Sequence, residues 1–238
     1  GSARYEYNDK LGRISKVLYN NDKGVEYRVV EYSYDNVNYS NSEGKPSEVV
    51  VKEDNKHVIM RRFSYHPTSQ IKAQEITLNG NEHVFVYRYT PGGNNQQITY
   101  PSGRVVNYQY NNAGDLTQIK SNGQLLATYS DYQPSGRYGK VAFANGVEEG
   151  RVYDQYNRVK DIVIQRGNDD LLDQRFSYNA HGEIEAVTDH LVPERTQTYE
   201  YNQLGYLTHA KGPWDTPLEY EYHANGNLKQ KDGKQYSY

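Results

Sequence analysis

The side chains in this chain that could do acid–base or metal chemistry are seven histidines and scattered carboxylates, because cysteine is absent. Asp189-His190 and His209 lie on or next to predicted strands of two neighbouring repeats and could approach one another. Catalysis of this kind also needs a nucleophile, and a metal site needs a third ligand, at a recognisable spacing. Neither is found, and His66, His181 and His223 stand where turn residues are expected. We therefore predict no catalytic residue, no metal site and no cofactor.

Two further segments could bind a ligand. The acidic turn 168–170 with Asp173 lacks the alternating ligands and the Gly of a calcium loop, so we interpret it as a polar hairpin turn. The single Trp, Trp214, lies in the rigid turn 212–217, where it could present a ligand platform to a sugar or protein partner or cover the sheet edge. We favour the edge cover. Asn38-Tyr39-Ser40 matches a glycosylation sequon, which a chain this rich in Asn contains by chance.

Composition narrows the class of protein. Only 35% of the 238 residues are hydrophobic, and that share includes 26 tyrosines, so a large apolar interior is not expected. An aromatic content of 13% and a net charge of -3 argue against disorder. The 27 basic and 30 acidic residues are mixed along the chain, which argues against a nucleic-acid partner, and no apolar run is long enough for a membrane span. A thin, repetitive structure packed by Tyr side chains fits best.

A repeated unit would position these side chains, and it is clearest at 107–119. Counting from Tyr110 as position 0, the unit has an aromatic residue at −2, Asn or Asp at +1, Gly at +4 and apolar residues at +6 and +9. The spacing of Tyr108 and Tyr110 predicts a strand, and 111–114 has turn chemistry. A second strand follows, and Asn122-Gly123 predicts a second turn. Each unit is therefore two antiparallel strands and two turns.

The unit recurs along the whole chain, which is typical of repeat architectures with periods of about 20 to 50 residues. We count ten copies and a truncated eleventh at Tyr238, and number them in chain order. The aromatic residues at −2 and 0 and the Gly at +4 form the predicted structural repeat motif: Tyr5, Tyr7, Gly12, Tyr32, Tyr34, Phe63, Tyr65, Tyr87, Tyr89, Gly93, Tyr108, Tyr110, Gly114, Tyr132, Gly136, Tyr153, Phe176, Tyr178, Gly182, Tyr199, Tyr201, Gly205, Tyr220, Tyr222 and Gly226. Position −2 departs from this pattern at Ser130 and Arg151, and position +4 at Ser69 and Asn157.

The repeat predicts an all-β fold of antiparallel β-hairpin repeats that form a long curved or spiralling sheet. Leu116 and Ile119, at +6 and +9, are three residues apart, so either a bulge or a sheet with two apolar faces is needed. The insertion 36–43 in copy two predicts an exposed loop. We expect the position-0 rings to pack across copies, so that losing the Tyr110 ring destabilises clearly and losing only its hydroxyl destabilises slightly.

Residues 5–17, with the sequence Tyr-Glu-Tyr-Asn-Asp-Lys-Leu-Gly-Arg-Ile-Ser-Lys-Val, resemble the RHS or YD-repeat family, whose pattern is Tyr-x-Tyr-Asp-x-x-Gly-Arg-Leu-x-x-Val. The segment 153–162 resembles it as well, with Asp154 and Arg158 in place. Among the copies, the Asp at +1 is replaced at Asn8, Asn111, Asn179, Asn202, His66 and His223, and the Arg after the turn survives at Arg13, Arg137 and Arg158. The resemblance covers residues 3–238, which we interpret as a single array, with 1–2 as a tag scar.

This resemblance implies a segment of an RHS-repeat β-shell, as in bacterial polymorphic toxins, insecticidal toxin complexes and teneurins. The implied function is structural and non-catalytic: to encapsulate or display a toxin or effector domain of a large secreted or cell-surface protein. The implied partners are the remaining RHS repeats and that toxin domain, with self-association through cut edges. The alternative is a carbohydrate-binding or cell-adhesion module whose exposed Tyr rows bind a glycan or cell-surface receptor. The family's C-terminal core segment, with its Asp-Pro-x-Gly elements, is not found among these residues.

Overall fold

The computed structural model describes residues 1–7, 11–54 and 56–237. Two compact units make up the chain: unit 1 comprises Gly1–Tyr110 with Ile119–Gln124, and unit 2 comprises Asn111–Gln118 with Leu125–Tyr238. Each is considered by itself below. Asn8, at position +1 of copy one, and Tyr238, which opens the truncated copy, lie outside the described residues.

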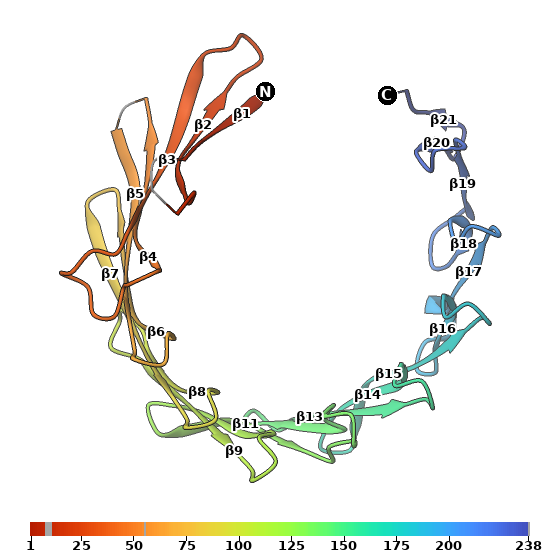
Figure 1. Ribbon diagram of the computed structural model, residues 1–238. Coiled ribbons are helices and arrows are strands. Elements are labelled where there is room, and N and C mark those ends of the chain that lie inside the picture. Colours follow the sequence, from red (N-terminus) through yellow and green to blue (C-terminus); the bar gives the residue numbers. More distant parts are fainter. Residues whose placement is uncertain (8–10, 55, 238) are drawn as a thin grey trace. The chain divides into compact units, whose positions relative to one another are not determined.

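Unit 1 is a run of antiparallel strands in which each strand pairs with the next one in sequence (Figure 1). The strands are β1 (Ser2–Tyr7), β2 (Ile14–Asn20), β3 (Glu26–Tyr34), β4 (Pro46–Glu53), β5 (Lys56–Tyr65), β6 (Ile71–Leu78), β7 (Asn81–Tyr89), β8 (Asn95–Thr99) and β9 (Val105–Tyr110). The next strand, β10 (Leu116–Ser121), has residues in both units.

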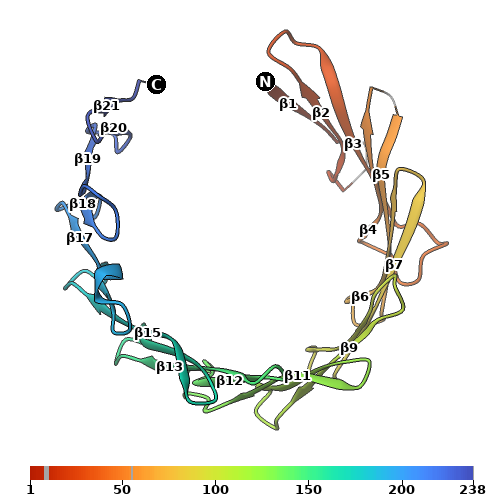
Figure 2. The ribbon, with the colours of Figure 1, turned by 180° about the vertical axis from the view of Figure 1, so that it is seen from behind.

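Unit 2 continues the same arrangement, and Figure 2 shows β17 to β21 following one another in chain order. Its elements are β11 (Gln124–Ser130), β12 (Lys140–Phe143), β13 (Val147–Tyr153), β14 (Val159–Arg166), β15 (Asp169–Tyr178), β16 (Ile184–Asp189), the 3-10 turn η1 (Pro193–Arg195), β17 (Gln197–Tyr201), β18 (Leu207–Lys211), β19 (Leu218–Tyr222), β20 (Leu228–Lys231) and β21 (Lys234–Gln235). Within the described residues η1 is the only helical element. The prediction of an all-β antiparallel fold is confirmed.

The first hairpin of most copies contains a β-bulge at a constant place. In copy three, Tyr65 pairs with Ile71 and Ser64 pairs with Ala73, so Lys72 is the extra residue. The same shift between positions −1 and 0 occurs in eight described hairpins, those of Tyr7, Tyr34, Tyr65, Tyr89, Tyr153, Tyr178, Tyr201 and Tyr222. Because the bulge absorbs one residue, positions +6 and +9 share the face of positions 0 and −2. The bulge, rather than a sheet with two apolar faces, is what the structure uses.

Several of the most buried side chains lie on the face that carries the tyrosines, although Leu18 and Val50, each 7% exposed, lie on the other face. Position +9 pairs with −2 of its own copy and with −4 of the next, as Ile162 does with Arg151 and Gln174. It is therefore covered from both sides, and Val17, Val141 and Ala210 are at most 4% exposed there. We call the face of positions −4, −2, 0, +6 and +9 the tyrosine face. The opposite face carries cross-strand ion pairs, such as Arg175 with Asp161 at 2.6 Å, which contribute little to stability where exposed.

The two exceptions at position −2 have local explanations. Asp131 has a positive φ of 56°, and this irregularity shifts the pairing so that Tyr129 lies opposite Val141 in place of Ser130. A Cβ at Gly139 would lie 2.6 Å from the Asp131 carbonyl oxygen, so the close approach needs a glycine. The Arg151 side chain pairs with Glu149 at 2.5 Å and lies over the Tyr138 ring at 5.0 Å. Arg151 thus fills the −2 position with a cation against an aromatic ring.

The insertion of copy two projects from the sheet as a structured loop (Figure 1). Its tip is exposed as predicted, with Val37 at 95%. Its base is tied to β5, because the Tyr65 backbone N–H donates to the Ser40 carbonyl at 2.8 Å and Asn41 Nδ2 donates to the Tyr65 carbonyl at 2.8 Å. Ser42 is 3% exposed and donates to the Asn36 carbonyl. The loop is therefore folded against the sheet and exposed only in part.

Candidate functional site

The position-0 tyrosines link neighbouring copies through their hydroxyl groups. The hydroxyl donates to the backbone carbonyl of position +6 in the preceding copy, for example from Tyr178 to Val159 at 2.7 Å. Eight such bonds of 2.6 to 3.0 Å occur in the described chain, from Tyr34, Tyr65, Tyr89, Tyr110, Tyr132, Tyr153, Tyr178 and Tyr201. Position +6 lies at the bulge, where the ladder is disrupted, so the hydroxyl satisfies a carbonyl that needs a partner. We call each bond a tyrosine rung.

The rung predicts a larger effect of losing the Tyr110 hydroxyl than the slight one expected from the sequence. Its bond to the Asn95 carbonyl is 2.7 Å long, and a phenylalanine there would leave that carbonyl without its partner. Burial raises the pKa of Tyr65, Tyr89 and Tyr110 above the ordinary value of a phenol. These hydroxyls therefore stay protonated, and able to donate, throughout the neutral range.

In several copies the side chain just before position +6, which we call +5, lies over the Tyr ring of the following copy. Arg13 is 4.2 Å from the Tyr34 ring centre, and Arg158 is 4.2 Å from that of Tyr178. Lys45 over Tyr65 at 5.1 Å and Arg137 over Tyr153 at 5.6 Å repeat the contact at longer range. A cation over an aromatic face is attracted by the ring quadrupole, by about 0.5–1 kcal/mol at exposed sites. In copy nine the residue is Tyr206, and its ring packs on Tyr222 with centres 5.0 Å apart.

The same +5 side chain also passes over the turn glycine of the following copy. A Cβ at Gly205 would lie 2.6 Å from Glu183 Oε1, and one at Gly226 would lie 2.7 Å from the Tyr206 hydroxyl oxygen. Both glycines also have a positive φ, which L side chains rarely adopt. Position +4 thus needs glycine for two independent reasons in these copies. At Gly136 only the φ of +78° applies, because a Cβ added there would have no neighbouring atom within 4 Å.

The histidines are held apart in separate polar contacts. His190 Nδ1 lies 3.4 Å from Asp173, and His209 Nδ1 lies 3.4 Å from Glu200. Asp189 is buried, and its Oδ1 accepts the backbone N–H groups of Leu191 and Val192 at 3.0 and 2.8 Å. These contacts are structural, so the structure does not assemble the cluster that the sequence allowed. In the part of the chain that the structure describes, no group of three or more His, Asp or Glu could hold a metal ion.

The other candidate residues lie in turns. His66 Nε2 lies 3.2 Å from the Tyr87 carbonyl oxygen, which can only accept a hydrogen bond from it, and the ring packs edge-on to the Tyr89 ring. His181 and His223 lie in the first turns of copies eight and ten. The ring of Trp214 folds back on its own turn, because a Cβ at Gly212 would lie 2.5 Å from it.

Across the described residues, no helix has the length and apolar character to cross a membrane.

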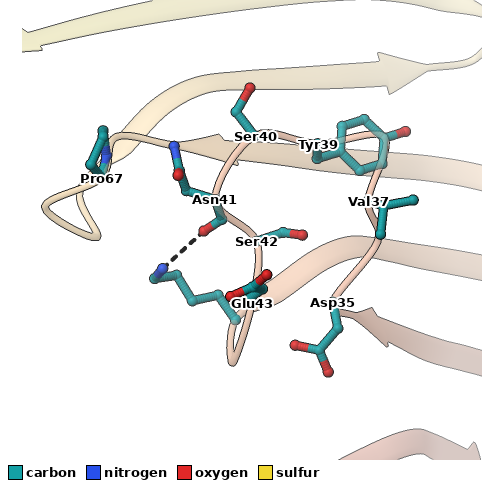
Figure 3. A pocket seen from close by; sticks show the side chains of 9 residues that line it. Asp35, Val37, Tyr39, Ser40, Asn41, Ser42, Glu43 and Pro67 are labelled. Atoms are coloured by element: carbon teal, nitrogen blue, oxygen red, sulfur yellow. Dashed lines mark hydrogen bonds between the residues drawn. The ribbon is translucent and has the colours of Figure 1, made fainter.

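A pocket of about 400 Å³ lies beside the loop of copy two (Figure 3). Asp35, Val37, Tyr39 and Glu43 line it from the loop, and Pro67 lines it from the turn of copy three. Asp35 is already engaged, because Oδ1 accepts the Gly44 N–H and Oδ2 accepts the Arg13 guanidinium. These two bonds hold the pKa of Asp35 below its ordinary value. This pocket is therefore lined in part by a carboxylate that already joins two copies, as the other first-turn contacts do.

Comparisons with known proteins agree with this repeat architecture. Residues 144–238 match the family described as Teneurin YD-shell. The crystal structure of TcdB2-TccC3-Cdc42 superimposes on 99% of this chain with a TM-score of 0.69 at 15% identity, and that of TcdB2-TccC3 on 93% with a TM-score of 0.66 at 14% identity. The Photorhabdus luminescens Tc holotoxin pore gives 0.64 over 96% at 14% identity. No curated protein matches the chain.

The solved chains are distant in sequence and far longer than this chain. Identities of 14% to 15% show a shared fold, and the chain spans only 15% to 16% of the length of those solved chains. The family match covers the C-terminal copies. The N-terminal copies have the same repeat motif and the same rungs. Residues 144–238 thus match the Teneurin YD-shell family, and nearly the whole chain shares the fold of these solved chains.

Proposed function

We propose that this chain is a structural, non-catalytic segment of an RHS-repeat shell that encloses or displays a toxin or effector domain within a large secreted or cell-surface protein. Residues 3–238 would form one uninterrupted array in that shell. The proposal rests on the superposition of 99% of this chain on 15% of a far longer chain in the TcdB2-TccC3-Cdc42 structure, and on the similar match to the Tc holotoxin pore. Its partners would be the other repeats of the same protein and the domain that they surround.

The way the chain uses its side chains supports a structural role. Position-0 hydroxyls donate to backbone carbonyls, and +5 side chains contact the neighbouring copy. The His and Asp side chains that could do acid–base chemistry lie in local pairs, such as His190 with Asp173. The alternative, a carbohydrate-binding or cell-adhesion module, requires exposed Tyr rings with free hydroxyls. The eight rungs favour packing over that role, because they leave those hydroxyls with their donors already used.

Limited proteolysis of the full-length parent protein tests this function. We expect the domain that follows the repeats to resist trypsin at a concentration that digests the same domain expressed alone. Changing Tyr110 and Tyr132 together to Ala, which removes two successive rungs, should make the enclosed domain digestible, whereas Tyr156→Ala, at an exposed turn tip, should not. Equal digestion of the domain in the parent protein and alone would contradict enclosure.

A further inference from the structure

In copies five, seven, eight and nine, the residues that flank the first turn, at +1 and +5, share one hydrogen-bond pattern whether +1 is Asp or Asn. Oδ1 of the +1 side chain accepts two backbone N–H groups, those of +3 and +5. In copy seven Asp154 accepts from Tyr156 and Arg158 at 2.8 and 2.9 Å. In copy eight Asn179 accepts from His181 and Glu183 at 3.0 and 3.1 Å. Oδ1 therefore does not distinguish the two residue types.

The second terminal atom of the +1 side chain does distinguish them, because it faces the +5 side chain. Asp154 Oδ2 accepts from Arg158 Nε at 2.7 Å. Asn179 Nδ2 donates to Glu183 Oε2 at 2.6 Å, and Asn111 Nδ2 donates to Asp115 Oδ2 at 2.9 Å. An oxygen at this place thus faces a guanidinium donor, and an amide nitrogen faces a carboxylate acceptor.

We propose that positions +1 and +5 form a matched pair. Asp at +1 requires a guanidinium that donates to it, and Asn at +1 pairs with a carboxylate at +5 that accepts from its amide. A mismatched pair would set either two carboxylates or two donors within hydrogen-bond distance. Asp35 obeys the same rule, although its guanidinium comes from Arg13 of the preceding copy. The pair explains why Asn replaces Asp in the YD motif of copies five and eight, where Asp115 and Glu183 replace the Arg.

The matched pair makes +1 a positioning residue for the contact with the next copy. Arg158, held by Asp154, lies over the Tyr178 ring. Glu183, held by Asn179, lies against Gly205 of the next turn. Burial, and then the charge of Glu183, raises the pKa of Tyr201. The pair therefore decides which charge each copy presents to the following rung, whether or not the array encloses a toxin domain.

Changing one amide to a carboxylate in two different turns tests the pair. Asn179→Asp places a carboxylate 2.6 Å from Glu183, whereas Asn202→Asp makes the same change opposite Tyr206, which carries no charge. Asn202 accepts the same two backbone N–H groups, so it is a matched control. In chemical denaturation at pH 7, we expect Asn179→Asp to raise the unfolding equilibrium constant about tenfold more than Asn202→Asp does.

The pH dependence gives a readout that a general loss of packing would not move. Two carboxylates in contact raise the folded-state pKa of one of them above its unfolded value near 4. The Asn179→Asp variant should therefore keep its stability below about pH 4 and lose it as pH rises through the raised pKa, relative to Asn202→Asp. The charged and titratable groups around this pair are Arg158, Tyr178, His181 and Tyr201, and they are the same with and without the substitution.

Rescue completes the test. Asn179→Asp combined with Glu183→Arg recreates the pair of copy seven, and we expect it to restore the unfolding constant to within about threefold of the parent chain. If Asn179→Asp does not fold at pH 7, refolding below pH 4.5 would support the pair, and an unfolded variant at every pH would overturn it. Equal losses in the two Asp variants with the same pH profile, or no rescue by Glu183→Arg, would also overturn it.

Discussion

Replacing Tyr178 with alanine should lower the free energy of unfolding by about 2–4 kcal/mol, because one side chain makes two contacts with the preceding copy. Its ring lies under Arg158 at 4.2 Å, and its hydroxyl donates to the Val159 carbonyl at 2.7 Å. Truncating a fully buried aromatic residue to alanine costs about 3–5 kcal/mol, and Tyr178 is only half-buried. Equilibrium unfolding in urea measures the loss.

Tyr156→Ala is the control for this variant. Tyr156 is 68% exposed at the tip of the turn in copy seven, and Arg158 also lies near its ring, at 4.9 Å. It makes no rung, so its loss should change stability by about 0.5 kcal/mol or less. A Tyr178→Ala variant as stable as Tyr156→Ala would show that the rungs do not hold the copies together.

Gly226→Ala is the second substitution with a large expected effect. The backbone of Gly226 has a φ of +84°, which costs an L residue about 1–2 kcal/mol. The added methyl group would also lie 2.7 Å from the Tyr206 hydroxyl oxygen and 3.3 Å from its Cζ. The ring would have to move and lose its packing on Tyr222. We expect a total loss of about 2–4 kcal/mol in urea unfolding.

Gly136→Ala separates the two causes, because Gly136 occupies the same repeat position with a φ of +78° and no atom within 4 Å of an added Cβ. It should lose about 1–2 kcal/mol from the backbone alone. Adding Tyr206→Ala to Gly226→Ala should cost less than the sum of the two single changes, since it removes the obstacle. Equal losses for Gly136→Ala and Gly226→Ala would mean that no clearance is needed over the turn.

The repeat and its strands could be predicted from the sequence because they depend on local spacing. Tyr108 and Tyr110 share a face two residues apart, and Asn111 and Gly114 carry turn chemistry wherever they occur. The bulge could not be decided, because Leu116 and Ile119 keep the same spacing in a bulged and in a two-faced sheet. Only the pairing register, such as that of Tyr65 with Ile71, separates the two.

The contacts between copies were less accessible from sequence, because they join residues about one repeat apart. Every residue type has a backbone carbonyl, so a hydroxyl that donates to one does not restrict which residue stands at +6. The rung from Tyr201 to Ile184 therefore could not be predicted from the sequence. The +5 position did carry a signal, the Arg after the turn at Arg13 and Arg158. Glu183 and Tyr206 obscured it, because they take the same place with different chemistry.

Tyr110→Phe compared with Tyr108→Phe tests whether the position-0 hydroxyl holds neighbouring copies together. The two tyrosines lie on the same strand and face, and both are half-buried. Only Tyr110 makes a rung, whereas the −2 position of Tyr108 is already Phe in Phe63 and Phe176. Urea unfolding should show a loss of about 1–2 kcal/mol for Tyr110→Phe and at most about 0.5 kcal/mol for Tyr108→Phe. Equal effects of the two substitutions would show that the position-0 hydroxyl does not hold neighbouring copies together.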